Sequence, residues 1–122
     1  MNERVLIIDD DELVRNYVSR ALSGRGFTLE TAVNGSSAVA LMEKEKFDVI
    51  ICDLKMPDIQ GDEVIKRARV LQPGIPVIVI SGSMSESSKA VINEMKVEGA
   101  LLKPFGIDEI RSLVDEVLKK TQ

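Results

Sequence analysis

Residues 49–57, Val-Ile-Ile-Cys-Asp-Leu-Lys-Met-Pro, form the stretch that decides the fold. Four apolar residues precede Asp53, and Pro57 with the later Gly61 indicates that the chain turns away just after that carboxylate. Such a run is typical of a strand buried on both faces. An aspartate at the end of a dry strand must be paired, hydrogen-bonded or metal-bound. We therefore ask which residues surround Asp53.

The composition is that of an ordinary globular protein. The 122 residues are 44% hydrophobic and 30% charged, and this length predicts one domain, placed at residues 1–122. No segment approaches the roughly 20 apolar residues of a membrane span, and the first apolar run is too short for a secretory signal. We expect a cytoplasmic protein without a membrane association.

The charge and the missing residue types exclude several functions. A net charge of -4 without a long basic run argues against direct nucleic-acid binding by this segment and suits a divalent cation. The absence of histidine excludes histidine-ligated zinc, a Ser-His-Asp triad and a phosphohistidine donor. The single cysteine, Cys52, cannot form an internal disulfide, and its place in the apolar run predicts a buried thiol.

Apolar patterns predict five strands that alternate with five helices. The strands are expected over residues 4–9, 27–32, 49–53, 75–80 and 100–102. The helices have apolar positions within residues 13–22, 38–45, 64–71, 86–95 and 107–118. Asp11 is expected to cap the first helix, Gly24 and Gly26 to end it, Asn34-Gly35 to form a turn, and Ser85 to cap the fourth helix. This alternation predicts an α/β doubly wound parallel sheet with helices on both faces.

Polar residues recur where the predicted strands end. They are Asp9, Asp10, Asp53, Ser81 and Lys103. Ligands of such sheets bind outside the carboxyl ends of the strands, so these side chains should share one crevice. Three close carboxylates repel one another unless a hard cation such as Mg²⁺ neutralises them. With a lysine beside them, the set favours phosphoryl transfer, with Asp53 as the nucleophile.

These residues resemble the receiver domain of two-component response regulators, the CheY-like family, over the whole chain. The matching motifs are Asp9-Asp10, Asp53 with Met56-Pro57 and Gly61, Ser81-Gly82, and Lys103-Pro104-Phe105. Each motif is weak alone, but their order and their places at strand ends make the set specific. The resemblance implies the (βα)5 flavodoxin-like fold, with a five-stranded sheet in the order 2-1-3-4-5.

The resemblance also implies a metal site. Asp10 would bind Mg²⁺, or Mn²⁺ as the alternative, directly. Asp9 would bind it directly or through water, Asp53 would give a carboxylate oxygen, and Lys55 would give its backbone carbonyl.

The implied reaction is Mg²⁺-dependent phosphorylation of Asp53 by a phosphohistidine on a sensor histidine kinase or phosphotransfer protein, or by a small phosphodonor. Lys103 would pair with the phosphoryl group, Ser81 would swing to hydrogen-bond it, and the Lys103-Pro104 bond would be cis. The protein would catalyse its own modification, without being a conventional turnover enzyme, and switch binding of an output domain or downstream protein. The oligomeric state stays open, with a phosphorylation-dependent dimer as one option.

Some positions modify this interpretation. The family usually has Tyr or Phe three residues before the lysine, whereas this chain has Ala100, so the aromatic half of the switch is missing. Ser83 lies where the family tunes the lifetime of the phosphoryl group, and Lys55 can tune the access of water. We expect Tyr17 to half cover the sheet as a helix residue and not to join the site.

Two other functions fit part of the pattern. A pseudo-receiver would keep the fold as an interaction module without phosphorylation. A haloacid dehalogenase-type phosphatase would use Asp9 and Asp11, but this assignment leaves Asp53 unused and lacks a cap domain.

Overall fold

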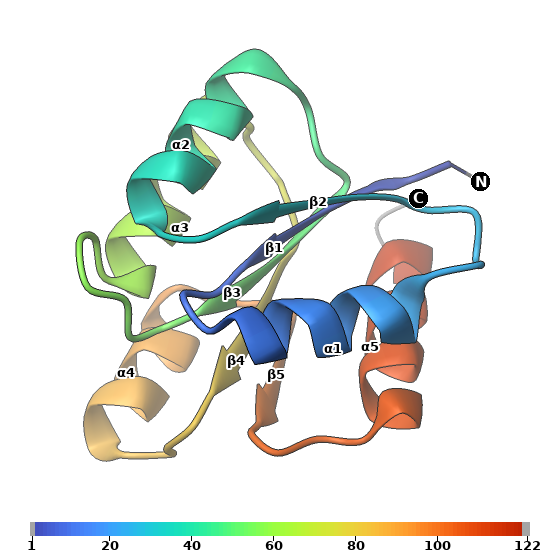
Figure 1. Ribbon diagram of the computed structural model, residues 1–122. Coiled ribbons are helices and arrows are strands. Elements are labelled where there is room, and N and C mark those ends of the chain that lie inside the picture. Colours follow the sequence, from blue (N-terminus) through green and yellow to red (C-terminus); the bar gives the residue numbers. More distant parts are fainter. Residues whose placement is uncertain (1, 121–122) are drawn as a thin grey trace.

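The computed structural model describes residues 2–120 and has five parallel strands alternating with five helices (Figure 1). The strand order is β2-β1-β3-β4-β5, as predicted. The strands are β1 (Arg4–Ile8), β2 (Thr28–Ala32), β3 (Val49–Asp53), β4 (Val77–Ser81) and β5 (Gly99–Leu102). The helices are α1 (Glu12–Leu22), α2 (Gly35–Lys44), α3 (Gly61–Leu71), α4 (Glu86–Glu94) and α5 (Ile107–Lys120).

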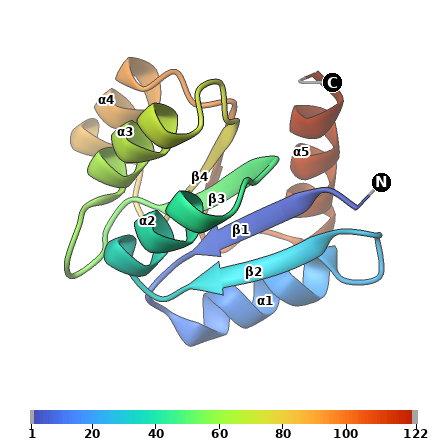
Figure 2. The same cartoon turned by 90° about the horizontal axis from the view of Figure 1, so that it is seen from above.

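Helices cover both faces of the sheet, with α1 and α5 on one face and α2, α3 and α4 on the other (Figures 1 and 2). Successive residues of β3 point to opposite faces. Ile50 and Cys52 pack on the α2/α3 side, and Val49 and Ile51 on the α1/α5 side. Because both faces are buried, the strand is apolar up to Asp53, and the Cys52 thiol is buried as predicted.

Side-chain caps fix where three helices begin. Asp11 accepts from the Leu13 amide at the start of α1, and Ser85 caps α4, both as predicted. The prediction of a turn at Asn34-Gly35 is wrong. Asn34 accepts from the Ser37 amide and caps α2, which begins at Gly35, because the cap satisfies an otherwise free donor. No helix within residues 2–120 is both long and apolar enough to cross a bilayer.

The start of β4 differs from the prediction of residues 75–80. The Ile75 amide donates to the Gln72 carbonyl at 3.1 Å, so Ile75 still belongs to the turn after α3. Pro76 follows and has no amide hydrogen to donate. The strand therefore begins at Val77, and it continues to Ser81, which pairs with Leu102 of β5.

Candidate functional site

Three carboxylates meet at the carboxyl ends of β1 and β3. These strands are neighbours, with Ile8 opposite Cys52, so the residues that follow are brought side by side. Asp9 is 0% exposed and Asp53 6% exposed, whereas Asp10 is exposed. One oxygen from each carboxylate lies within 4.8 Å of the others. The structure thus brings together the three acids that the sequence placed at strand ends.

Lys103 reaches this cluster from the end of β5. Its Nζ lies 2.8 Å from Asp9 Oδ2 and 3.5 Å from Asp53 Oδ2. Its backbone amide donates to the Ser81 carbonyl at 2.7 Å, and the Lys103–Pro104 peptide bond is cis. Within residues 2–120, Lys103 supplies the ion pairs of a cluster that holds three carboxylates. The ammonium therefore offsets only part of the negative charge.

Burial and nearby charges shift the pKa values of Asp53 and Lys103. Burial raises the pKa of Asp53, and the Asp9 charge raises it further, while Lys103 and the Lys55 amide oppose this shift. Burial alone would lower the pKa of Lys103, but its contacts with Asp9 and Asp53 outweigh burial and raise it. Lys103 is thus an ammonium at neutral pH, and Asp53 lies where its negative charge is unfavourable.

A hard divalent cation fits this donor set. All three side chains offer oxygen atoms, which Mg²⁺ and Mn²⁺ prefer, and the cluster carries more negative charge than Lys103 neutralises. The Lys55 amide approaches Asp53 Oδ1 at 3.4 Å, so the backbone of the β3–α3 loop passes next to the acid. A cation at this place would relieve the repulsion that raises the pKa of Asp53.

Gly61 closes the β3–α3 loop. Its amide donates to the Leu54 carbonyl at 2.9 Å. A Cβ at this position would lie 2.6 Å from the Asp53 carbonyl oxygen and from the Leu54 Cα, which is too close for any side chain. The backbone of α3 therefore lies directly against the end of β3 and fixes where the loop leaves the site.

Ser81 lies at the end of β4, beside β3, and its hydroxyl is engaged in its own loop. Ser81 Oγ donates to the Ser83 carbonyl at 2.7 Å and accepts from the Ser83 amide at 3.2 Å. Ser83 is half-buried. The hydroxyl must leave the first of these bonds before it can donate toward Asp53.

Ala100 lies on β5 and faces the side of the sheet that α2, α3 and α4 cover. Its half-buried methyl group packs against the core of that side. Other partly buried residues packed against the same core include Val91, Ile92, Met95 and Val97. The position where the resemblance predicts an aromatic ring is therefore filled by a small side chain.

The expectation that Tyr17 half covers the sheet as a residue of α1 leaves out its contact with another loop. Tyr17 is 39% exposed, and its hydroxyl donates to the Phe105 carbonyl at 2.8 Å. The two rings meet edge to face, with 5.9 Å between their centroids. Phe105 lies in the neighbouring β5–α5 loop, which the sequence pattern alone does not place. A mostly apolar hollow of about 500 Å³ opens here, lined by Leu13, Val14, Tyr17, Lys103, Pro104 and Phe105.

Sequence reasoning missed two other polar residues near the site. Arg15 donates from Nη1 to the Asp9 carbonyl at 2.8 Å. Asp58 accepts three hydrogen bonds from the start of α2. The pattern of polar residues at strand ends gave no signal for either residue, because Arg15 lies within α1 and the partners of Asp58 lie at the start of α2, 22 and 23 residues earlier in the chain.

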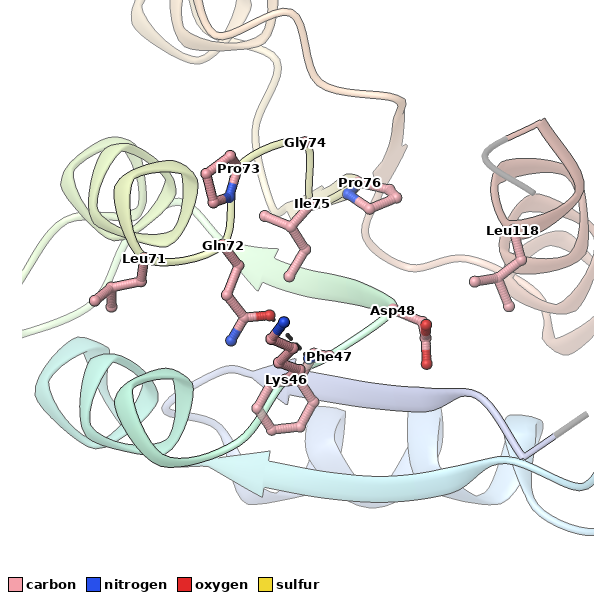
Figure 3. A pocket seen from close by; sticks show the side chains of 10 residues that line it. All are labelled: Lys46, Phe47, Asp48, Leu71, Gln72, Pro73, Gly74, Ile75, Pro76 and Leu118. Carbon is pink, nitrogen blue, oxygen red and sulfur yellow. Dashed lines mark hydrogen bonds between the residues drawn. The ribbon is translucent and has the colours of Figure 1, made fainter.

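A second hollow, of about 380 Å³, lies at the opposite end of the sheet (Figure 3). It surrounds the turn after α3, where Gln72 Oε1 accepts from the Phe47 amide at 2.9 Å. Gln72 Nε2 donates to the carbonyls of Met42 and Glu45 at 3.0 and 2.7 Å. This side chain holds the chain before β3 to the end of α2, which is a structural role.

Comparisons with known proteins show the family of the chain. The model of the response regulator receiver domain family matches residues 5–115. Sporulation initiation phosphotransferase F of Bacillus subtilis (strain 168) is 36% identical over 121 residues, covering 97% of this chain and 95% of that protein. Response regulator MprA of Mycobacterium ulcerans (strain Agy99) is 30% identical and covers 100% of this chain, which spans only 53% of that relative. A CheY-like receiver domain structure from Methanospirillum hungatei JF-1 superposes with a TM-score of 0.93 at 26% identity, covering 99% of this chain and 97% of that one.

Proposed function

The chain belongs to the response regulator receiver domain family, and from this premise we propose that it is a phosphorylation-controlled switch whose acceptor is Asp53. One observation carries the proposal. The Asp53 carboxylate is buried at the end of the central strand, and the Lys103 ammonium lies 3.5 Å away. One oxygen from each of the Asp9 and Asp10 carboxylates lies within 4.8 Å of an Asp53 oxygen. Residues 1–122 then act as one receiver domain, which regulates and does not turn over a substrate.

In the proposed reaction, a carboxylate oxygen of Asp53 bonds to the phosphorus of a phosphohistidine. The phosphorus–nitrogen bond breaks, and its electron pair returns to the imidazole of the donor. Lys103 turns from Asp9 to the phosphoryl oxygens, and the Ser81 hydroxyl leaves Ser83 to donate to them. Attack of water on the acyl phosphate later restores the Asp53 carboxylate and releases inorganic phosphate. Ser83 and Lys55 would tune that step.

Mg²⁺, or Mn²⁺ in its place, would neutralise the phosphoryl oxygens when bound. Asp10, Asp9, Asp53 and the Lys55 carbonyl would hold it. The oxygen-only donor set and the uncompensated charge of the cluster support this assignment.

The proposed donors are a sensor histidine kinase or a histidine phosphotransfer protein in the cytoplasm. The apolar hollow around Tyr17 and Phe105 supports contact with such a protein, because Lys103 lines both this hollow and the acidic cluster. The signal would pass to an output domain or downstream protein through α4, β5 and α5, without an aromatic ring at Ala100. A phosphorylation-dependent dimer is one form that this output can take.

The test is incubation of the full chain with Mg²⁺ and acetyl phosphate, followed by mass spectrometry of the intact protein and of its peptides. We expect one phosphoryl group on Asp53, lost in Asp53→Ala and kept in Asp108→Ala, which removes an exposed acid of α5. A phosphoryl group on Asp9 would instead identify the phosphatase alternative. If the wild type bound no Mg²⁺ at millimolar concentration, the pseudo-receiver alternative would replace this proposal.

A further inference from the structure

The β3–α3 loop is tied to a helix far from it in sequence. Asp58 Oδ1 accepts from the Gly35 amide at 3.0 Å. Asp58 Oδ2 accepts from the Ser36 amide at 3.0 Å and from the Ser36 hydroxyl at 2.7 Å. The helix's own cap, Asn34, takes the Ser37 amide. Asp58 therefore acts as a second cap of α2, supplied from the loop that follows Asp53.

Packing and charge both hold this contact. A Cβ on Gly35 would lie 2.7 Å from the Ile59 Cβ and 2.9 Å from the Val64 Cγ2, so the loop lies directly on the first residue of α2. The Ser36 hydroxyl and amide lower the pKa of Asp58, so its charge persists at neutral pH. A negative charge at a helix N-terminus is favourable because the free amides carry partial positive charge.

Besides the contact of the Lys55 amide with Asp53 Oδ1, two hydrogen bonds join parts of the loop to one another. The Gly61 amide donates to the Leu54 carbonyl at 2.9 Å, and Gln60 Nε2 donates to the Met56 carbonyl at 3.3 Å. These bonds set the shape of the loop, whereas Asp58 sets its place relative to α2. Lys55, whose carbonyl is a proposed cation ligand, lies between the end of β3 and this anchor.

We propose that Asp58 is a positioning residue for the cation site. By anchoring the loop on α2, it holds the Lys55 carbonyl beside the carboxylates of Asp9, Asp10 and Asp53. The inference rests on the proposed function, because it takes these groups as the cation ligands. Thermodynamic linkage requires the reverse effect as well: a bound cation must strengthen the contacts between Asp58 and α2 by the same free energy.

The first test measures the Mg²⁺ dissociation constant of the full chain by titration calorimetry. We expect Asp58→Ala to bind at least about fivefold more weakly. Asp58→Asn, which keeps one acceptor oxygen, should bind with an intermediate affinity. The control Asp62→Asn removes the same charge from a half-buried residue in the first turn of α3 and should leave the affinity unchanged in high salt, which screens charges near the surface.

Two serine variants separate the effect of the hydrogen bonds to Asp58 from the effect of its negative charge. Ser36→Ala removes one donor to Asp58 without changing the net charge, and we expect a smaller loss of Mg²⁺ affinity. Ser37→Ala is its matched control, because no hydrogen bond joins the Ser37 hydroxyl to Asp58 within residues 2–120. This pair also tests the inference if Asp58→Ala fails to fold.

Hydrogen exchange of the wild type gives the reciprocal readout. Mg²⁺ should slow exchange at the amides of Gly35 and Ser36 by the factor by which Asp58→Ala weakens Mg²⁺ binding. If the Asp58 and Ser36 variants bound Mg²⁺ as tightly as the wild type, this inference would be overturned and the proposed function would stand. A wild type that bound no Mg²⁺ would overturn both.

Discussion

The two ends of the sheet hold polar side chains in opposite ways. At the amino end, the neutral Gln72 amide has a partner for its oxygen and two for its nitrogen. At the carboxyl end, three carboxylates share the Lys103 ammonium, and burial raises the pKa of Asp53. A polar group that only stabilises a fold is satisfied where it lies. A cluster with excess charge costs stability and so indicates chemistry.

The largest effect of removing a positive charge should come from Lys103→Ala. Without the ammonium, nothing from this position balances the charge on the transferring phosphoryl group, and we expect phosphorylation by acetyl phosphate to slow by about 100-fold. The rate is measured from the mass gain over time. Lys46→Ala, at the hollow of the amino end, should keep the wild-type rate. Equal rates in the two variants would remove the proposed role of Lys103.

The complementary change is Gln72→Ala at the amino end. It leaves one amide and two carbonyls without their side-chain partner, and we expect the free energy of unfolding to fall by about 2–3 kcal/mol. Denaturant titration measures this loss. The phosphorylation rate of the folded variant should equal that of the wild type, and a slower rate would mean that the two ends are coupled.

Asp10→Asn should change the free energy of unfolding less than Gln72→Ala does, and in the opposite direction. Removing one charge from the cluster relieves repulsion, so in the absence of Mg²⁺ the free energy of unfolding should rise by about 0.5–1 kcal/mol, as for other exposed charge pairs. Mg²⁺-dependent phosphorylation should be abolished at the same time. Thermal unfolding with and without Mg²⁺ measures both states. A metal-free variant less stable than the wild type would show that repulsion at the carboxyl end is negligible.

The smallest effect concerns pH. The pKa of Asp53 is raised above its ordinary 3.8, so between 3.8 and the raised value the folded state binds more protons than the unfolded state. Stability therefore falls as the pH rises through this window. The metal-free Asp53→Asn protein should be more stable than the wild type at about pH 7, and the difference should shrink toward about pH 4. A difference that stays constant with pH would contradict the raised pKa.

Asp58 gives the control of opposite sign. Its pKa is lowered, so its contribution to stability is fully present above its ordinary 3.8 and is lost only as the pH falls below that value. Asp58→Asn should therefore be less stable than the wild type at neutral pH, and the difference should shrink only under acid conditions.

Most of the fold could be predicted from the sequence because the apolar pattern is strong. The run before Asp53 predicted a central strand, and the alternation of strands and helices predicted the parallel sheet. Two errors came from local turn chemistry. Asn34 proved to be a cap because it found the Ser37 amide, and β4 begins late because Ile75 bonds back to Gln72.

The candidate site could be predicted in part for a related reason. Parallel strands bring their carboxyl ends together, so residues placed at those ends must be neighbours. The gathering of Asp9, Asp10 and Asp53 and the reach of Lys103 to them follow this rule.

The sequence pattern by itself determined the strands, their parallel direction and the acids at their ends, because these depend on short-range periodicity and on handed connections, while the strand order was implied by the family resemblance. Only the tertiary structure decided that Tyr17 contacts Phe105 and that Asp58 caps α2. Both contacts join segments that are distant in the chain, through side chains whose direction depends on how helices and loops pack. An apolar pattern records which face is buried, but not which polar atom lies opposite another.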